Sequence, residues 1–548
     1  MMGRERQQEA ARNRVLRRVD WRFLLPDPWP KNTLCFADGL LAAGVAAVSE
    51  KTTMAKVANA ATSLEPEAFD LAVARNPNQT VLTQAWHALR PGGVCYSEWY
   101  RPLVGGLPGV TSRLAQAGFG AIAGYWPWPW PDRAPTLFWL PLMAPGALHY
   151  YQVSRPLPQS PWRRALYHGQ WALWRLAQQA GWLAPLCVVA QKLEGDRLND
   201  LPESLSRQFH SEGTMTVSAK LSPQGHWLLL TGGRRAINKV VGLHFADAAT
   251  TPRLAVKWPR VPESAPALAQ EARILCALQE RYPTLTGAPR VIFQQGQQER
   301  FMVGESVVSG LPVGMQLNRD NYCHFALQAA DWLAQLAQNS PVQPQSVWWE
   351  RLIAKRLTRF RQCFGGVVAQ AQLQQSQALL STLSDLPLVC EQRDFSPWNV
   401  LVDQQGQFGV LDWESAELQG LPALDLIYFL TYLAFWVEGL PVHGNMPIAQ
   451  LRRAYRATLD PTTMTGNVTA VSLSRYTQQI DLDPAAIAPL RRLTWLIHAD
   501  SEYQHFCADM GAQPPAALLR QSLFVNLWEE DGYAGEACHK AGQERLLC

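Results

Sequence analysis

The sequence predicts a multidomain protein in which an amino-terminal α/β domain precedes an α+β domain built of two lobes. Its 548 residues are more than one hydrophobic core usually organises. Residues 67–100 alternate strand, helix, turn and strand, which is typical of α/β units. The second half begins rich in strands and becomes rich in helices. We therefore expect an α/β domain at 1–193, a polar linker at 194–212, a strand-rich lobe at 213–310 and a helical lobe at 311–548.

Composition narrows the class of protein. A net charge of +4 over this length is too small to indicate binding to nucleic acid or to an anionic membrane. The ten cysteines show no CxxC pair, so reduced thiols and a cytoplasmic location are expected. The charged amino terminus lacks the apolar stretch of a signal peptide. The longest apolar run, 421–440, contains Asp425 and Glu438, and we expect a buried helix there rather than a membrane span. The 22 tryptophans include several in a proline-rich stretch at 125–131, expected to be a loop. We expect its rings to pack in the core, with lining of a site as the alternative.

In the amino-terminal half, strand-like Phe69-Asp70-Leu71 precedes a helix at about 80–89, and Leu89-Arg-Pro-Gly-Gly93 leads into a second strand. This order resembles the middle of class I S-adenosylmethionine-dependent methyltransferases, which implies a Rossmann-like domain. The glycine-rich cofactor loop of that family is reduced here to Gly39 and Gly44. We therefore expect a degenerate methyltransferase-like domain, used for docking or substrate capture, without bound S-adenosylmethionine.

The strand-rich lobe carries a candidate phosphate-binding loop. Strands at 226–231 and 239–245 flank Gly232-Gly233, whose backbone amides can approach phosphate oxygens. A glycine pair of this kind is also common in an ordinary hairpin. Lys257 lies within an apolar strand, where its ammonium needs a partner. The expected partner is Glu271, on an amphipathic helix at 266–278.

Residues 301–310 are predicted to form the last strand of this lobe and a hinge, with the backbone near Glu305 and Val307 facing the adenine ring of a nucleotide. Helical periodicity then predicts helices in the next lobe at 325–336, 348–363, 370–383 and 422–433, and further helices over 441–520.

The most informative stretch is 390–414. Asp394 is followed by four spacers and Asn399, and then by a hairpin that returns the chain to Asp412. Phosphoryl transfer from ATP needs one carboxylate to orient a hydroxyl, and an amide with a second carboxylate to hold magnesium. The hairpin makes the set more specific than the Asp–Asn spacing alone.

This stretch resembles the aminoglycoside phosphotransferase and choline-kinase group of protein-kinase-like small-molecule kinases. The positions that match the pattern of the group are Asp394, Asn399, Asp412, Trp413, Glu414, Asp425 and Leu426. The resemblance covers roughly the last 340 residues and implies a bilobal kinase-like fold. This chain departs from the pattern at Gln392-Arg393, where the family has His-Gly.

The resemblance implies ATP and Mg²⁺ as cofactors and a role for each site residue. Asp394 would be catalytic, Asn399 and Asp412 would bind metal, and Asp425 would support the catalytic loop. The expected ATP-binding set is Gly232, Gly233, Lys257, Glu271, Glu305 and Val307.

The predicted activity is ATP- and magnesium-dependent phosphoryl transfer to a hydroxyl of a small molecule or glycan precursor. The acidic cluster expected of an aminoglycoside site is not evident. Two alternatives stay open: a nucleotide-binding regulator or scaffold that transfers nothing, and an S-adenosylmethionine-dependent methyltransferase using the amino-terminal domain.

Overall fold

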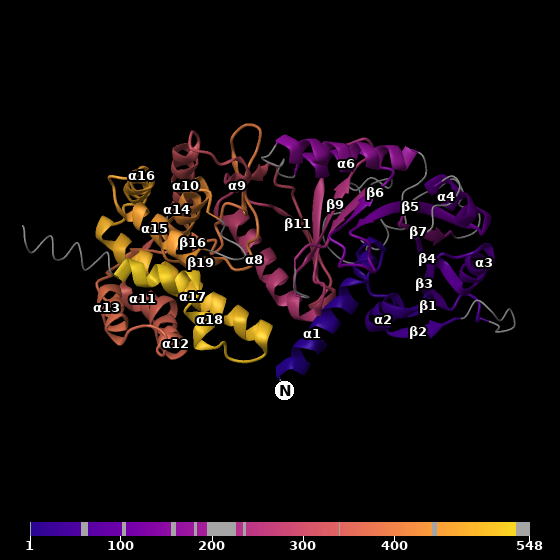
Figure 1. Cartoon of the computed structure of the whole chain (residues 1–548), viewed down its shortest axis with the longest axis horizontal. Helices are drawn as coiled ribbons and strands as arrows, with labels where there is room; N and C mark the ends of the chain where they lie inside the picture. The colour runs from indigo at the N-terminus through magenta and orange to yellow at the C-terminus, as the bar shows by residue number, and fades with distance from the viewer. Residues whose placement is uncertain are drawn as a thin grey trace, which may run out of the picture. The chain divides into compact units, whose positions relative to one another are not determined.

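The computed structural model divides into two compact units, which we describe separately (Figure 1). The sheet unit comprises residues 8–269 and 291–307, and the helical unit comprises 1–7, 270–290 and 308–548. The structure describes residues 2–55, 64–100, 106–154, 161–179, 184–193, 226–233, 237–338, 340–440 and 447–532.

The described strands of the sheet unit form a twelve-stranded mixed sheet in the order β11-β12-β10-β9-β8-β6-β5-β7-β4-β3-β1-β2. Their bounds are β1 (Asn32–Phe36), β2 (Lys51–Met54), β3 (Phe69–Arg75), β4 (Leu89–Trp99), β5 (Phe119–Trp128), β6 (Phe138–Pro141), β7 (Leu186–Lys192), β8 (His226–Leu230), β9 (Val240–Phe245), β10 (Leu254–Trp258), β11 (Val291–Gln295) and β12 (Met302–Glu305).

Strands β1 to β4 are parallel, in the spatial order β2-β1-β3-β4, and β7, β5 and β6 continue the sheet antiparallel. The helices of this part are α1 (Met2–Arg17), α2 (Gly39–Val48), α3 (Gln79–Ala88), α4 (Gly106–Gln116), α5 (Pro145–Val153) and α6 (Pro161–Gln179). The predicted helix at 80–89 is confirmed. The prediction of a loop at 125–131 is wrong, because strand β5 continues through Trp128. The Trp126 ring packs in the core.

Strand β8 pairs with β6, so strands expected in two different domains share one sheet. Strands β8, β9, β10, β12 and β11 continue the sheet beyond β6 with antiparallel pairing. The alternating apolar residues of 226–305 accord with this arrangement. The predicted domain boundaries therefore stay a prediction. However, β6 and β8, which lie on opposite sides of the boundary expected near residue 193, belong to one sheet. The predicted linker at 194–212 lies outside the described residues.

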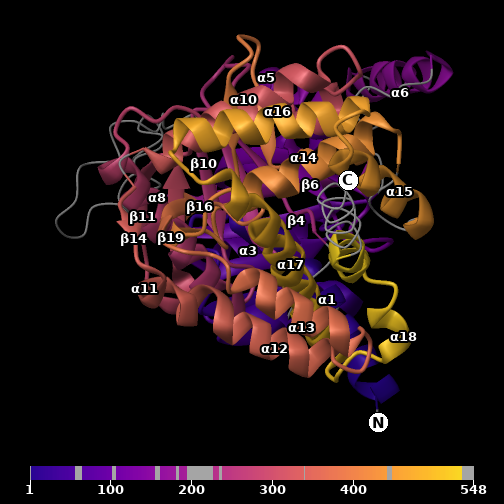
Figure 2. The same ribbon diagram turned by 90° about the vertical axis from the view of Figure 1, so that its left-hand side faces the viewer.

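The helical unit is an assembly of helices with short two- and three-stranded sheets. Helix α17 packs against α12, α13 and α14, and α10 packs against α14 and α16 (Figure 2). The bounds are α9 (Val313–Gln316), α10 (Tyr322–Ala337), α11 (Gln345–Trp349), a π-helical turn (Glu350–Ala354), α12 (Lys355–Phe364), α13 (Gln370–Leu380), α14 (Leu424–Val437), α15 (Ile448–Leu459), α16 (Met464–Gln479), α17 (Ile487–Met510) and α18 (Ala516–Leu519).

The run 421–440 forms the buried helix α14, as predicted; its first twelve residues are all buried. Among the described residues, no helix is both long and apolar enough to cross a membrane. Helix α8 (Ala265–Arg281) begins in the sheet unit and continues into the helical unit. Three strands of the helical unit frame the candidate site: β16 (Val389–Glu391), β17 (Val400–Val402) and β18 (Phe408–Val410).

Candidate active site

Asp394 and Asn399 lie together in the loop between β16 and β17. The Asn399 Nδ2 atom donates to the Asp394 Oδ2 atom at 2.7 Å and to the Asp394 carbonyl oxygen at 3.1 Å. The two side chains come from one loop, so the five-residue spacing is enough to bring them into contact. The amide oxygen of Asn399 remains as an acceptor.

The hairpin of β17 and β18 returns Asp412 to the same place. Val400 pairs with Val410, and the Leu411 amide donates to the Asn399 carbonyl oxygen at 2.9 Å. Asp412 then takes a left-handed backbone conformation, with φ of 63°. Non-glycine residues rarely adopt this conformation, and many of those that do lie at functional sites.

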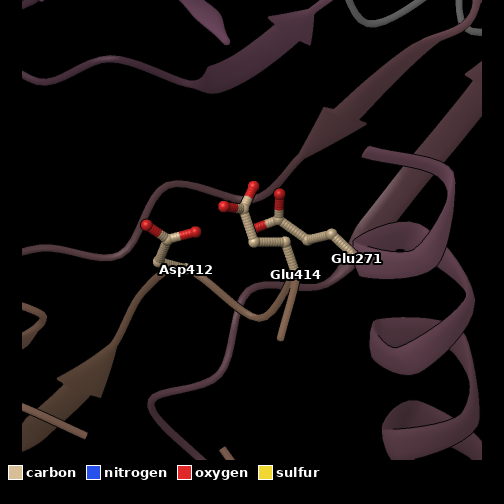
Figure 3. A group of neighbouring side chains, drawn as sticks. All are labelled: Glu271, Asp412 and Glu414. Atoms are coloured by element: carbon tan, nitrogen blue, oxygen red, sulfur yellow. The ribbon is translucent and has the colours of Figure 1, made fainter. Parts of the chain in front are cut away.

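Three carboxylates meet beside this hairpin (Figure 3). One oxygen each from Glu271, Asp412 and Glu414 lies within 4.8 Å of the others. Glu271 comes from helix α8 and also accepts a hydrogen bond from the Trp413 amide at 3.2 Å. Carboxylate and amide oxygens are the ligands preferred by Mg²⁺, so these groups and Asn399 could hold a divalent cation. Glu414 was not among the predicted site residues, although the Asp-Trp-Glu motif contains it.

Gln392 stands where the family has histidine, and its side-chain amide makes three hydrogen bonds. Its Nε2 atom donates to the carbonyl oxygens of Leu411 at 3.0 Å and Asp412 at 2.6 Å, and its Oε1 atom accepts from the Asp394 amide at 2.8 Å. Sequence reasoning noted this residue only as a departure from the family pattern. No local pattern indicates these contacts.

Asp425, at the start of α14, holds the backbone that leads into the catalytic loop. Its carboxylate oxygens accept from the Gln392 amide at 2.6 Å and the Arg393 amide at 2.8 Å. Arg393 stands where the family has glycine and has a left-handed φ of 69°. The two amide bonds stabilise that conformation, and ion pairs of Arg393 with Glu391 and Glu417 accompany it.

The carboxylates are close enough to perturb one another. Burial raises the pKa of Asp394 to about 8, and the Asp412 carboxylate adds to the rise, while the hydrogen bond from Asn399 opposes it. Burial and then the Glu391 carboxylate raise the pKa of Asp425 to about 7. A cation bound among these groups would offset their mutual repulsion.

In the sheet unit, Lys257 forms an ion pair with Glu305, which was expected to lie beside the adenine ring at the hinge. Its Nζ atom lies 2.7 Å from the Glu305 Oε2 atom, and both side chains are buried. Residues 255 and 305 are paired across β10 and β12, which brings the two side chains onto one face. The predicted pair of Lys257 with Glu271 joins the two units and stays a prediction, as does the role of the Val307 backbone.

The glycine turn lies after β8, and Gly233 has a φ of 86°, a conformation that favours glycine. Its continuation at 234–236 lies outside the described residues. Arg260 holds both sides of this loop, because its Nη2 atom donates to the Thr231 carbonyl at 3.0 Å and its Nη1 atom to the Asn238 carbonyl at 3.1 Å. Its Nε atom donates to Asp20 at 2.9 Å.

A second guanidinium reaches the same place, since Arg17 Nη2 donates to the Thr231 carbonyl at 3.1 Å. The Thr231 amide donates to Leu137, and its hydroxyl to Thr136. The amino-terminal part of the sheet unit therefore holds the base of the glycine loop. Sequence reasoning missed Arg260, because its partner Asp20 lies 240 residues away.

The carboxyl end of strand β4 is occupied by an internal ion pair. Arg18, fully buried, donates twice to Glu98, at 2.7 and 2.6 Å, and Tyr96 and Tyr100 also donate to this carboxylate. Parallel α/β sheets bind ligands at the carboxyl ends of their strands. A cavity of about 300 Å³ lies instead at the amino-terminal edge, beside Asp70 and Arg90.

Aromatic side chains gather on α14 and α17 of the helical unit. The Tyr428 and His498 rings stack at 4.0 Å, and the Phe524 ring lies 5.2 Å from His498. The Asp394 carboxylate contributes to raising the pKa of Tyr428 well above its usual value, after burial and the neighbouring Tyr432.

Comparison with known proteins supports the assignment of the carboxy-terminal part. Residues 232–463 match the model of the phosphotransferase enzyme family. No curated protein sequence matches the chain.

One similar solved structure is that of an aminoglycoside-3'-phosphotransferase of type VIII, which is 18% identical in sequence to this chain. The match covers 50% of this chain and 94% of that protein, with a TM-score of 0.33. An aminoglycoside phosphotransferase APH(3'')-Id from Streptomyces rimosus, in complex with ADP and streptomycin, has 14% identity, coverage of 46% and 90%, and a TM-score of 0.29.

The family match rests on the segment that contains the glycine turn, Lys257, the catalytic loop and Asp412. At a coarse level it supports a phosphotransferase-like part of the chain. The resemblance predicted from the sequence is therefore confirmed for residues 232–463, which are similar to the phosphotransferase enzyme family.

Proposed function

We propose that the protein transfers the γ-phosphate of ATP to a hydroxyl of a small molecule, with Mg²⁺ as the metal. The arrangement of Asp394, Asn399 and Asp412 carries this proposal. The amide of Asn399 bonds the Asp394 carboxylate at 2.7 Å, and the β17–β18 hairpin returns Asp412 to Asn399. Phosphoryl transfer relies on positioning and charge compensation, for which this arrangement is suited.

Each group has a proposed role. Asp394 orients the acceptor hydroxyl and takes its proton as the oxygen attacks the phosphorus in line. Asn399 and Asp412 hold Mg²⁺, which neutralises charge on the phosphates when bound, and Glu414 adds an oxygen donor nearby. Lys257 is proposed to contact the α- and β-phosphates, with the Gly232-Gly233 turn covering them.

Lys257 would share its ammonium between its carboxylate partner and phosphate oxygens. In the structure its ammonium pairs with buried Glu305, so the neighbourhood already stabilises the charged form. A phosphate group would add a further acceptor to an ammonium with three donors. Glu271, which accepts from Trp413, would help to fix the segment that carries Asp412.

The acceptor class remains broad within this proposal. A glycan precursor falls within this class. We also propose that the protein acts in the cytoplasm, where ATP and reduced thiols are found.

Thermal unfolding tests the nucleotide site directly. A ligand that binds only the folded state raises the melting temperature by mass action. We expect stabilisation by ATP with Mg²⁺, less stabilisation without metal, and loss of the metal effect in Asp412→Ala. A panel of hydroxyl acceptors with detection of ADP then tests transfer. Absence of stabilisation at millimolar ATP would contradict the proposal.

One alternative keeps the fold and omits transfer. The departure at Gln392-Arg393 motivates a nucleotide-binding regulator, and stabilisation by ATP without ADP formation over a broad acceptor panel would favour it. For the amino-terminal part we propose a scaffold, because the Arg18–Glu98 pair occupies the carboxyl end of β4. Heat released on titration with S-adenosylmethionine would instead favour a methyltransferase.

A further inference from the structure

Helix α6 is attached to the sheet unit by only one of its sides. It lies along the outside of that unit (Figure 1). On the attached side, the Trp174 ring is buried, 5.5 Å from the Trp126 ring of β5. Trp171 lies 6.1 Å from Tyr151, and the Tyr167 hydroxyl donates to the Gln152 carbonyl at 3.2 Å. These contacts account for the apolar residues on the inner side of the helix.

The outer side is apolar as well. Trp162, Leu166, Leu173 and Leu176 are 60%, 61%, 69% and 60% exposed. At about 100° per residue they fall on one stripe, which the exposed residues Ala165, Gly169 and Ala172 widen to roughly a third of the helix circumference. A helix at the surface of a globular protein normally shows polar residues there. Folding alone therefore does not explain the outer stripe.

The charge around this stripe has one sign. From 133 to 193 the sequence contains no Asp or Glu, but it contains six cationic residues: Arg133, Arg155, Arg163, Arg164, Arg175 and Lys192. On α6, Arg164, His168 and Arg175 are exposed and border the apolar stripe on one side, by the same helical geometry. The exposed side of α6 therefore combines an apolar stripe with a basic border.

We propose that α6 docks the protein onto an anionic lipid bilayer, with the helix axis in the plane of the surface. The stripe from Trp162 to Leu176 would enter the boundary of the acyl chains, and Arg164 and Arg175 would meet lipid phosphates. Interfacial helices have this division into an apolar face with Trp and Leu and a basic border. Exposed Met143, just before helix α5, and Val153, its last residue, add apolar surface close to α6 in the sequence.

A lipid surface fits better than a second copy of the chain or an unrelated protein. The exposed Arg164 and Arg175 beside the apolar stripe complement anionic headgroups, whereas two such basic surfaces would repel one another. Tryptophan is enriched where protein meets the membrane interface. This inference does not rest on the proposed phosphotransferase activity.

Vesicle co-sedimentation of the full chain tests the proposal. We compare phosphatidylcholine vesicles with vesicles that also contain phosphatidylglycerol. We expect binding to the anionic vesicles about tenfold tighter or more, weakened by salt. The double variant Leu166→Glu/Leu173→Glu should lose this binding, and Arg164→Gln/Arg175→Gln should weaken it about fivefold for each charge removed.

The matched control is Ile292→Glu/Met54→Glu, which places the same charges at exposed apolar positions on β11 and β2, the two edge strands of the sheet, and should bind as the unmodified protein does. Unchanged melting temperatures would show that each variant is folded. Equal binding by the Leu166→Glu/Leu173→Glu variant would overturn the proposal. So would absence of vesicle binding together with a dimer, measured by analytical ultracentrifugation, that the same variant dissociates.

Discussion

Gln392 donates a hydrogen bond to the Asp412 carbonyl oxygen at 2.6 Å while it accepts one from the Asp394 amide at 2.8 Å. A single side-chain amide thus joins the two segments that carry the proposed catalytic and metal-binding carboxylates. Its hydrogen bonds go to the backbone of both segments and not to their carboxylates.

Replacing Gln392 by alanine should therefore disorder both segments. With three hydrogen bonds lost, we expect the free energy of unfolding to fall by about 2–4 kcal/mol and turnover to fall with it. Gln392→His, which restores the family residue, should retain more stability and activity, as chemical denaturation and ADP release would show. Equal loss in the two variants would argue against the hydrogen-bonding role.

Asp394→Asn should separate chemistry from binding. The amide keeps the shape of the side chain but accepts no proton, so turnover should fall by about a hundredfold to ten-thousandfold. Because Asp394 is not proposed to bind nucleotide, the stabilisation by ATP with Mg²⁺ should persist. Turnover at the unmodified rate would remove Asp394 from the mechanism.

Lys257→Met should destabilise the sheet unit and weaken ATP binding. The substitution leaves the buried Glu305 carboxylate without the ammonium at 2.7 Å, which we expect to cost about 3–5 kcal/mol. Adding Glu305→Gln to the Lys257→Met chain should recover part of the stability without recovering ATP binding. Denaturant titrations of the single and double variants measure the first effect, and calorimetry with ATP measures the second. If Lys257→Met binds ATP normally, Lys257 does not contact phosphate.

Arg260→Ala should loosen the glycine loop through both of its sides. Loss of the bonds to the Thr231 and Asn238 carbonyls, and of the pair with buried Asp20, should cost about 3–5 kcal/mol of stability. Arg260→Lys keeps the charge but cannot make all three bonds, so its effect should be intermediate. The informative readout is the dissociation constant for ATP, which should rise in both variants even where each remains folded. An unchanged constant would leave Arg260 with a structural role alone.

His498 should make the protein sensitive to acid. Burial and the nearby Arg356 lower the pKa of His498 to about 3, well below its ordinary value near 6.5. The unfolded chain therefore takes up a proton more readily, so stability from this residue is complete above pH 6.5 and is lost as the pH falls towards 3. Between pH 7.5 and 4.5 we expect a loss of about 2–3 kcal/mol from His498 alone.

The control for this prediction is His498→Phe, which preserves stacking with Tyr428 and removes the titrating group. Denaturation midpoints measured across the pH range should fall less steeply for the variant than for the unmodified protein. Parallel pH profiles would show that another group, such as buried His244, dominates.

The sequence determined the local parts of the candidate site. Asp394, Asn399 and Asp412 lie within nineteen consecutive positions, and one loop and one hairpin are enough to bring them together. Likewise, the apolar spacing that predicted α8 and α14 reflects periodicity within single elements. Short-range geometry of this kind is set by backbone hydrogen bonding and side-chain alternation, which a sequence displays directly.

Only the tertiary structure decided which distant groups meet. Arg260 reaches Asp20 across 240 residues, and the partner seen for Lys257 is Glu305 from another strand of the sheet. The pairing of β6 with β8 merges strands that composition assigned to separate domains. No periodicity links such residues, because their contacts follow from sheet order. The outer face of α6 is apolar in the sequence, but only the packing of Trp174 shows which side stays exposed.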